Sequence, residues 1–310
     1  MLKPRALAPG ALVGVVAPAS PVRQEFLEQG LAEISRLGFR TKLGRSILAR
    51  GRYTAGSAAE RLADLMELWE DPQVSAVFCA RGGYGALELL DRLEPERFRA
   101  APKVFLGSSD ATALLLFLTG QADLVSFHGP MVAQQIARGE AAYDRESLLQ
   151  LLGDPGKARH LSASPAKPLH GGTAEGVLLG GCLSLVASLV GTRFLPSFRG
   201  ALLFLEDTGV KPYQIDRMLT QLRLAHCFEG VMGIIFGEMP GCEQHPEQGY
   251  RLEEVLRDLT ADLEVPVLFG FPSGHSVSPA VTLPLGVRAR LTCEPSQAVP
   301  GLSLLEPAVA

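Results

Sequence analysis

Apolar residues in the first half of the chain fall into two alternating patterns. Short continuous runs of strand length occupy 12–16, 74–79 and 104–106. Residues 27–37 and 62–69 instead carry apolar positions at the three-to-four-residue spacing of an amphipathic helix. Strand and helix patterns that alternate in this way are typical of a parallel sheet covered by helices on both faces. We therefore expect an α/β domain in this half.

Cap residues predict where the helices begin and end. Ser20-Pro21 is a favourable helix start, because a capping serine precedes a proline at the first helical position. Ser57 and Glu60 have the spacing of a capping box, and Asp71-Pro72 ends the helix that follows. Two further helices are expected at 86–93 and 112–118.

The second half has a more mixed pattern. Residues 154–176 contain several prolines and a glycine pair with little periodicity, which predicts a linker between domains at 1–153 and 177–310. The elements expected beyond it are helices at 183–189, 213–225 and 252–263, strands at 202–205 and 233–236, and a β-rich tail at 281–292.

Composition narrows the class of protein. Of the 310 residues, 47% are hydrophobic, enough for a buried core in each half, and the net charge of −4 predicts no affinity for nucleic acid or an anionic membrane. The five cysteines are scattered without a CxxC pair, so we expect no disulfide framework, no metal site and a reducing cytoplasm. The N-terminal apolar segment imitates a signal peptide, but Pro9-Gly10 interrupts it, and we interpret 12–16 as the first strand. No stretch is long and apolar enough to span a bilayer.

A serine, a glutamate and a histidine follow one another in settings suited to nucleophilic catalysis. Ser108 and Ser109 lie between a strand and a helix, where a serine is lifted out of the sheet and the following N–H groups face developing negative charge. Glu206 ends the apolar run 202–205, and His275 follows a glycine in a turn. Attacker, orienting acid and general base are the parts of a serine hydrolase. Taken alone, either serine could be an ordinary helix cap.

Other residues carry weaker signals. The turn Arg81-Gly82-Gly83-Tyr84-Gly85 follows a strand and suits close backbone approach to a ligand, but it matches neither a P-loop nor a dinucleotide fingerprint. Asp207 is an alternative to Glu206 as a carboxylate at the strand end. His128 is the second-best placed histidine and could line a pocket. Cys242 and His245 lack a second ligand pair, so we reject a metal site there.

Together these segments resemble the LD-carboxypeptidase family of serine peptidases, which also includes microcin-immunity peptidases. Each motif is short, but all occur in the family's order along most of the chain. They are Ala17-Pro18-Ala19-Ser20, Tyr53-Thr54-Ala55-Gly56-Ser57, Arg81-Gly82-Gly83-Tyr84-Gly85, Gly107-Ser108-Ser109-Asp110, His128-Gly129-Pro130-Met131, Glu175-Gly176, Gly180-Gly181, Leu205-Glu206-Asp207, Ile215-Asp216-Arg217-Met218-Leu219 and Gly274-His275.

The resemblance implies roles for individual residues. It implies that Ser109, rather than Ser108, is the nucleophile, Glu206 the triad acid and His275 the base, with the backbone N–H groups of Asp110 and Gly83 as the oxyanion hole. Arg81 and Tyr84 of the glycine turn are expected to bind substrate, although Arg81 could instead brace the turn.

The resemblance also implies a fold and a substrate. The expected fold is a Rossmann-like N-terminal domain with a parallel sheet and a smaller β-rich α/β C-terminal domain, commonly in a homodimer. The expected reaction removes terminal D-alanine from a murein tetrapeptide during cell-wall recycling, without a cofactor.

Three other functions remain open from the sequence. A microcin-immunity peptidase acting on a peptidyl-nucleotide would favour an aromatic residue near the site. The single tryptophan, Trp69, lies on an expected core stripe, although a phenylalanine or tyrosine could take its place. An α/β-hydrolase esterase would carry the same order of serine, acid and histidine on loops of one sheet. A two-domain solute-binding protein would require a functional secretion signal.

Overall fold

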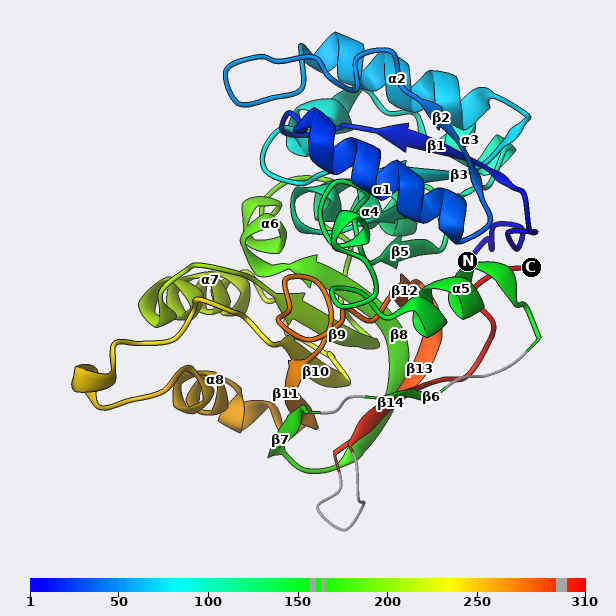
Figure 1. The fold of residues 1–310 in the computed structure, drawn as a ribbon. Helices are drawn as coiled ribbons and strands as arrows, with labels where there is room; N and C mark the ends of the chain where they lie inside the picture. Colours follow the sequence, from blue (N-terminus) through cyan, green and yellow to red (C-terminus); the bar gives the residue numbers. More distant parts are fainter. Residues whose placement is uncertain (157–159, 163–164, 294–299) are drawn as a thin grey trace.

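Two β-sheets, each flanked by helices, lie one above the other in the computed structural model (Figure 1). The structure describes residues 1–156, 160–162, 165–293 and 300–310. The N- and C-termini lie side by side, and the Ala310 N–H donates to the Pro4 carbonyl. The mixed α/β class expected from the sequence is confirmed. Within the described residues, no helix is both long enough and apolar enough to cross a membrane.

The first sheet has six strands in the order β12-β5-β4-β3-β1-β2, and all neighbours are parallel except β12 and β5. Its strands are β1 (Leu12–Val16), β2 (Arg40–Leu43), β3 (Val74–Cys79), β4 (Val104–Gly107), β5 (Ser126–His128) and β12 (Leu283–Leu285). Its helices are α1 (Gln24–Arg36), α2 (Ala58–Glu70), α3 (Pro95–Ala100), α4 (Thr112–Gly120) and α5 (Arg145–Gly153), with 3₁₀ turns η1 (Ala86–Arg92), η2 (Ser109–Ala111) and η3 (Ile136–Arg138). Trp69 is fully buried beneath α2 against Phe98, as its place on the apolar stripe predicts.

The second sheet has eight strands in the order β6-β14-β13-β8-β9-β10-β11-β7, and its centre, β8 to β11, is parallel. Its strands are β6 (His160–Ser162), β7 (Lys167–His170), β8 (Thr173–Cys182), β9 (Ala201–Glu206), β10 (Gly233–Gly237), β11 (Val267–Phe271), β13 (Arg288–Thr292) and β14 (Gly301–Leu304). Its helices are α6 (Leu183–Ser188), α7 (Pro212–Leu224) and α8 (Leu252–Thr260), with 3₁₀ turns η4 (Pro246–Gln248) and η5 (Ala261–Leu263).

Two segments are placed differently from the sequence expectation. Residues 154–176, expected as a linker, contain β6, β7 and the first part of β8, all hydrogen-bonded into the second sheet. β12 comes from the expected C-terminal domain but pairs with β5 of the first sheet, with Leu283 opposite His128. The late part of the chain therefore ties the two sheets together.

The expected helix start is confirmed at α2, and the structure differs from the expectation at α1 and at residues 86–93. The capping box of Ser57 and Glu60 is present at the start of α2, as predicted. The predicted start at Ser20-Pro21 is wrong, because α1 begins at Gln24 after an extended Arg23. The Ser20 hydroxyl is engaged elsewhere: it donates to the Tyr53 carbonyl and accepts from the Tyr84 N–H. The helix expected at 86–93 is the 3₁₀ turn η1.

Candidate active site

Ser109 occupies a strained turn between β4 and α4. Its backbone φ is +58°, a left-handed conformation that costs a residue with a side chain about 1–2 kcal/mol. Ser109 is partly exposed, whereas Ser108 is buried with an extended backbone. Strain of this kind persists where the surrounding structure fixes it, and it commonly marks a functional residue. The structure therefore distinguishes between the two serines, and only Ser109 is presented toward solvent.

The glycine turn packs directly against Ser109. A Cβ at Gly82 would lie 2.7 Å from the Ser109 Cβ, 2.8 Å from its Oγ and 3.3 Å from the Asp110 N. The next residue, Gly83, has φ +112°, and a Cβ there would lie 2.2 Å from the Ser20 Oγ. Only glycine fits either position, so the turn can bring its backbone N–H groups alongside the serine.

Asp110 is the residue that connects the serine turn to the glycine turn. Its buried carboxylate accepts the Ala86 N–H at 2.7 Å, at the start of η1. Burial raises the pKa of Asp110, and this hydrogen bond and the Arg61 charge oppose the shift. Arg61, buried on α2, donates to the Pro18 and Gly85 carbonyls from the other side. The glycine turn is therefore held by side chains from separate elements.

Glu206 and His275 form a hydrogen-bonded pair at the second sheet. The carboxyl ends of the parallel strands β9, β10 and β11 lie at one edge, with Glu206 ending β9 and His275 in the loop after β11. β10 lies between them but ends in Gly237, where a Cβ would lie 2.6 Å from the Glu206 Cβ. Glu206 Oε2 accepts from the His275 ring Nδ1 at 2.8 Å and from the His275 backbone N–H at 2.9 Å.

Each partner of this pair favours the charged form of the other. Burial raises the pKa of the Glu206 carboxyl, but the nearby His275 and His128 rings outweigh burial and hold it well below its usual range. Burial lowers the pKa of His275, yet the carboxylates of Glu206 and Asp207 raise it above its ordinary value. The Glu206 side chain is fully buried and the His275 side chain is 20% exposed. The Glu206 carboxylate is therefore held inside the protein, while part of the His275 ring is exposed to solvent.

Asp207, the neighbouring carboxylate, has a structural role instead. Its Oδ2 accepts from the Ser184 N–H at 2.9 Å and from the Ser184 hydroxyl at 2.7 Å, in the first turn of α6. Of these two carboxylates at the end of β9, Glu206 is hydrogen-bonded to a histidine ring, whereas Asp207 is hydrogen-bonded to Ser184.

The two sheets meet beside these residues. The Thr112 hydroxyl, in the first turn of α4, accepts the Cys182 N–H at 3.0 Å, and Cys182 is the register partner of Glu206. A Cβ at Gly181 would lie 2.6 Å from the Thr112 Cγ2. The serine turn is thus anchored to the strand beside the acid. Within the described part of the chain, the Ser109 hydroxyl and the His275 ring do not form a hydrogen bond.

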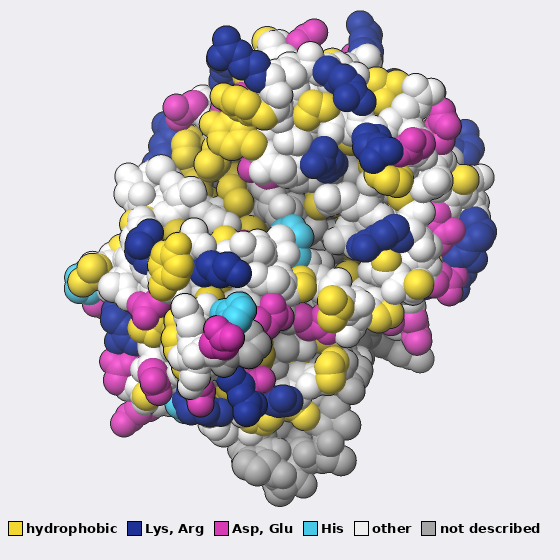
Figure 2. Space-filling view, turned by 60° about the vertical axis from the view of Figure 1, so that its left-hand side comes forward, with side chains coloured by type: hydrophobic (Ala, Val, Ile, Leu, Met, Phe, Trp, Pro, Cys, Tyr) yellow, Lys and Arg dark blue, Asp and Glu magenta, His cyan; other side chains and the backbone are white. Residues whose placement is uncertain are grey.

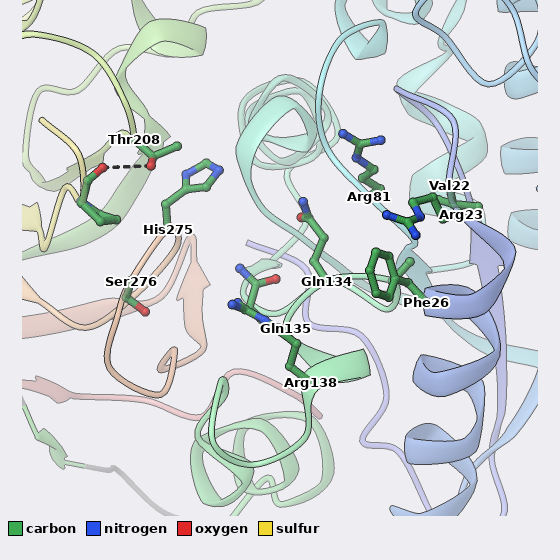
Figure 3. A pocket seen from close by; sticks show the side chains of 12 residues that line it. Val22, Arg23, Phe26, Arg81, Gln134, Gln135, Arg138, Thr208, His275 and Ser276 are labelled. Carbon is green, nitrogen blue, oxygen red and sulfur yellow. Dashed lines mark hydrogen bonds between the residues drawn. The ribbon is translucent and has the colours of Figure 1, made fainter.

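A cavity of about 460 Å³ opens next to His275 (Figure 3). His275 and Thr208 line it from the second sheet, and Arg81, Arg23 and Phe26 face them from the first, with Gln134, Gln135 and Arg138 between. Figure 2 shows a hollow between the upper and lower parts of the molecule, with a histidine side chain inside it and basic side chains beside it. None of the described residues that line the cavity is acidic. The cavity therefore suits an anionic ligand.

The expected substrate-binding residues behave differently from one another. Arg81 lines the cavity while it donates to the Pro21 carbonyl at 2.8 Å, so it is both braced and accessible to a ligand. Tyr84 is outside the cavity lining, 46% exposed, and its ring packs edge-on against Tyr53 at 5.1 Å.

Sequence reasoning gave too little weight to His128 and missed the glutamines. His128 is fully buried, with its Nε2 3.6 Å from Glu206 Oε1. His128 is the register partner of Gly107, which ends the strand before Ser109. The sequence signal that could have identified His128 is that it ends the next strand after the one leading to Ser109. Gln134 and Gln135 line the cavity from an irregular segment that no periodicity marks.

Within the described residues, no group of three or more His, Cys, Asp or Glu side chains could hold a metal ion. In the part of the chain that the structure describes, the five cysteines form no disulfide with one another, and four of them are buried.

Comparison with protein families gives two matches that together cover most of the chain. Residues 13–129 match the LD-carboxypeptidase N-terminal domain, and residues 175–291 match the LD-carboxypeptidase C-terminal domain. The chain is 42% identical to a putative carboxypeptidase of Streptomyces coelicolor, over 95% of this chain and 94% of the relative. It is 38% identical to a probable murein peptide carboxypeptidase of Bacillus subtilis, over 96% and 93%. A murein tetrapeptide carboxypeptidase of Pseudomonas aeruginosa is 34% identical over 85% and 87%.

Solved structures with the same fold cover nearly the whole chain. A muramoyltetrapeptide carboxypeptidase from Oxalobacter formigenes superposes with a TM-score of 0.83 at 28% identity, over 95% of this chain and 98% of that one. The microcin C7 self-immunity protein MccF superposes with a TM-score of 0.90 at 24% identity, over 100% of both chains. The second likeness concerns the fold alone.

Proposed function

The chain belongs to the LD-carboxypeptidase family of hydrolases, and we propose that it uses Ser109, Glu206 and His275 to remove a terminal D-alanine from murein tetrapeptide. The observation that carries this proposal is the hydrogen bond between Glu206 and His275, whose ring lines the cavity. Arg81 lines the same cavity, and the next residue, Gly82, packs against the strained Ser109. We place the reaction in cell-wall recycling because relatives are named for murein peptides.

In the proposed mechanism, His275 Nε2 removes the proton of the Ser109 hydroxyl as its Oγ attacks the carbonyl before D-alanine. Glu206 holds the ring through Nδ1, so the Nε2 lone pair faces the serine and the imidazolium is stabilised once it forms. The imidazolium then gives its proton to the leaving amine of D-alanine. Water, deprotonated by the same ring, hydrolyses the acyl-enzyme and regenerates Ser109.

The oxyanion would be held by the backbone N–H groups of Asp110 and Gly83. Support comes from the close packing of the glycine turn on Ser109, which brings the two peptide segments together. Each such donor contributes about 3–4 kcal/mol to lowering the barrier. The hydrogen bond between the Asp110 carboxylate and the Ala86 N–H fixes the relative position of both segments before substrate arrives.

Substrate recognition would rest on the basic cavity. A murein tetrapeptide carries several free carboxylates, and Arg23, Arg81 and Arg138 supply positive charge without an acidic neighbour in the described lining. Arg81 is the best candidate for the terminal carboxylate, because its bond to Pro21 holds the guanidinium in place. Tyr84 lies outside the cavity lining and is half-exposed, so it would contact only a part of the substrate that extends beyond the cavity.

The runner-up function is cleavage of a peptidyl-nucleotide, as in the self-immunity protein. That reaction favours an aromatic platform near the site. Trp69 is fully buried in the core of the first domain and cannot serve, whereas Phe26 lines the cavity. An esterase of the α/β-hydrolase type is less compatible, because it would hold all three groups on one sheet, whereas Glu206 ends β9 of the second. The murein substrate has the better support, because two relatives named for murein peptides are 38% and 34% identical to this chain, whereas the microcin C7 self-immunity protein is 27% identical.

Three further elements belong to the same proposal: a nucleophile carried by the first sheet with the acid and base carried by the second, a cytoplasmic location and a homodimer. The relatives' names concern peptides rather than assembly, so the dimer needs its own measurement. Sedimentation equilibrium of the purified chain would measure it directly, with a mass of 33.1 kDa for one copy.

The test of the function is release of D-alanine from purified murein tetrapeptide. We expect Ser109→Ala to abolish release and Ser108→Ala, the matched control one residue away, to leave most of it. Binding of the tetrapeptide to Ser109→Ala should remain measurable by calorimetry, because the cavity is unchanged. Loss of activity in the Ser108 variant alone would overturn the assignment, and absence of D-alanine from the wild type would reject the substrate.

A further inference from the structure

His128 is a fully buried histidine that the proposed mechanism does not use. It ends β5, with Gly107 of β4 on one side and Leu283 of β12 on the other. Its ring packs edge-on against Phe204 of β9, with 5.1 Å between ring centroids. His128 therefore lies where the first sheet meets the strand that carries the acid.

Unpartnered polar atoms meet at this point. Among the described residues, neither ring nitrogen of His128 has a hydrogen-bond partner, and neither does Glu206 Oε1. Buried polar groups are nearly always paired, so a histidine and a carboxylate oxygen left facing each other require an explanation. The separation is 3.6 Å, which is 0.6–0.7 Å longer than an ordinary hydrogen bond of about 2.9–3.0 Å.

A bridging water does not fit this gap. Two hydrogen bonds of about 2.8 Å that meet at a water molecule separate the bonded groups by roughly 4.6 Å. The observed distance is a full ångström shorter. Direct donation from His128 Nε2, completed by a small movement of either side chain, is the arrangement that pairs this nitrogen with Glu206 Oε1.

We propose that His128 is a positioning residue for the triad acid. In the tautomer that carries its proton on Nε2, the ring donates to Glu206 Oε1 and holds the carboxylate so that Oε2 stays directed at His275. The inference rests on the proposed triad. The two oxygens of Glu206 then have different partners. Oε2 accepts both hydrogen bonds from His275, and Oε1 accepts the hydrogen bond from His128.

Loss of the donor should affect the base through the acid. A carboxylate that loses one hydrogen-bond donor attracts a proton more strongly, so it stabilises the protonated form of the neighbouring imidazole more. The titratable groups that face Glu206 are His275, His128 and Cys182, and Asp207 acts on His275 from the next position. Without His128, the pKa of His275 should therefore rise, and the carboxylate should turn more freely.

The test compares three variants in the full chain. His128→Phe keeps an aromatic ring against Phe204 but removes the donor, and His128→Gln keeps an N–H near the position of Nε2. Ser126→Ala is the matched control on the same strand, because Ser126 is also fully buried but bonds only to the Leu115 carbonyl. The readout is the rate at which a fluorophosphonate labels Ser109, followed by intact mass between pH 5 and 9. In this reaction Oγ bonds to phosphorus, fluoride leaves and His275 takes the proton.

We expect Ser109 of His128→Phe to be labelled at least tenfold more slowly than Ser109 of the wild type at pH 7. The acidic limb of its pH–rate profile should lie at higher pH than that of the wild type. His128→Gln should stay within about threefold of wild type, and Ser126→Ala should be unchanged. Equal rates for His128→Phe and wild type would overturn the inference, as would equal losses in the Phe and Gln variants. A second variant keeps the test decisive if His128→Phe does not fold. His128→Asn then replaces it, because the shorter amide does not reach Glu206 Oε1. Equal labelling rates for the Asn and Gln variants would then overturn the inference. A wild type that is not labelled would refute the triad itself, and this inference with it.

Discussion

Gly82→Ala should disable the nucleophile while leaving the fold intact. Gly82 does not have the left-handed backbone of its neighbour Gly83, so an added methyl group has a steric cost only. That methyl would lie 2.7 Å from the Ser109 Cβ and 2.8 Å from its Oγ, where carbon contacts are normally about 3.5–4.0 Å. The serine must therefore move by about 1 Å.

A displacement of about 1 Å at a reacting atom costs on the order of 100-fold in rate, equivalent to about 2.7 kcal/mol of barrier. We expect kcat/KM for D-alanine release to fall by that factor. Ser109 lies on a partly exposed turn that can yield, so the melting temperature should change little. A coupled D-amino-acid oxidase assay and thermal unfolding measure the two quantities on the same samples.

Gly14→Ala provides the matched control, because its methyl would meet the core instead of the site. It would lie 3.1 Å from the Leu68 Cβ and Cδ1, between β1 and α2. Overpacking there should cost about 1–3 kcal/mol of unfolding free energy and leave kcat/KM near the wild-type value. The reasoning would be refuted if Gly82→Ala hydrolysed murein tetrapeptide at the wild-type rate, or if both variants lost activity in proportion to stability.

Three further predictions concern the same site. Glu206 raises the pKa of His275, which must be neutral to act as base, so the acidic limb of the kcat/KM profile should lie above pH 6.5. Glu206→Gln should shift this limb to lower pH and reduce kcat by orders of magnitude. A wild-type acidic limb below pH 6.5 would contradict the pairing. The lowered pKa of Glu206 contributes stability that is present above its ordinary value of 4.5, so the melting temperature should drop as pH falls below 4.5, and by less in Glu206→Gln. Ser109→Gly should unfold at higher temperature than Ser109→Ala, by the equivalent of about 1 kcal/mol, since glycine relieves the left-handed strain; equal melting temperatures would argue against that strain.

The strand-level pattern located two of the three candidate side chains, Ser109 and Glu206, because each follows an apolar run of strand length. Gly107 followed by serines after 104–106, and Glu206 after 202–205, are positions where a side chain leaves a sheet. The pairing of Glu206 with His275 depends on something a single sequence does not display, the adjacency of β9, β10 and β11. Gly237 ends β10 and leaves room for the Glu206 side chain, and this role can be recognised only once the strand order is known.

The errors have equally local causes. Ser20-Pro21 has the composition of a helix start, but its hydroxyl is used by Tyr53 and Tyr84, which are distant in sequence. The proline-rich composition of 154–176 predicted a linker, although these residues supply edge and central strands of the second sheet. Proline is compatible with edge positions such as β7, so composition alone could not separate the two cases.

β12 has a consequence for how the protein is made. The sheet that carries Ser109 contains strands from the first 128 residues, but its β5 edge is covered only when Leu283–Leu285 arrive. At about 5–20 residues per second, a ribosome needs roughly 8–30 s to synthesise the intervening segment. During that interval the β5 edge is unpaired, and an unpaired edge is a site for association with other chains. The nascent first half is therefore a candidate client for chaperones, and a gene truncated before residue 283 should yield an aggregating fragment rather than a soluble nucleophile domain.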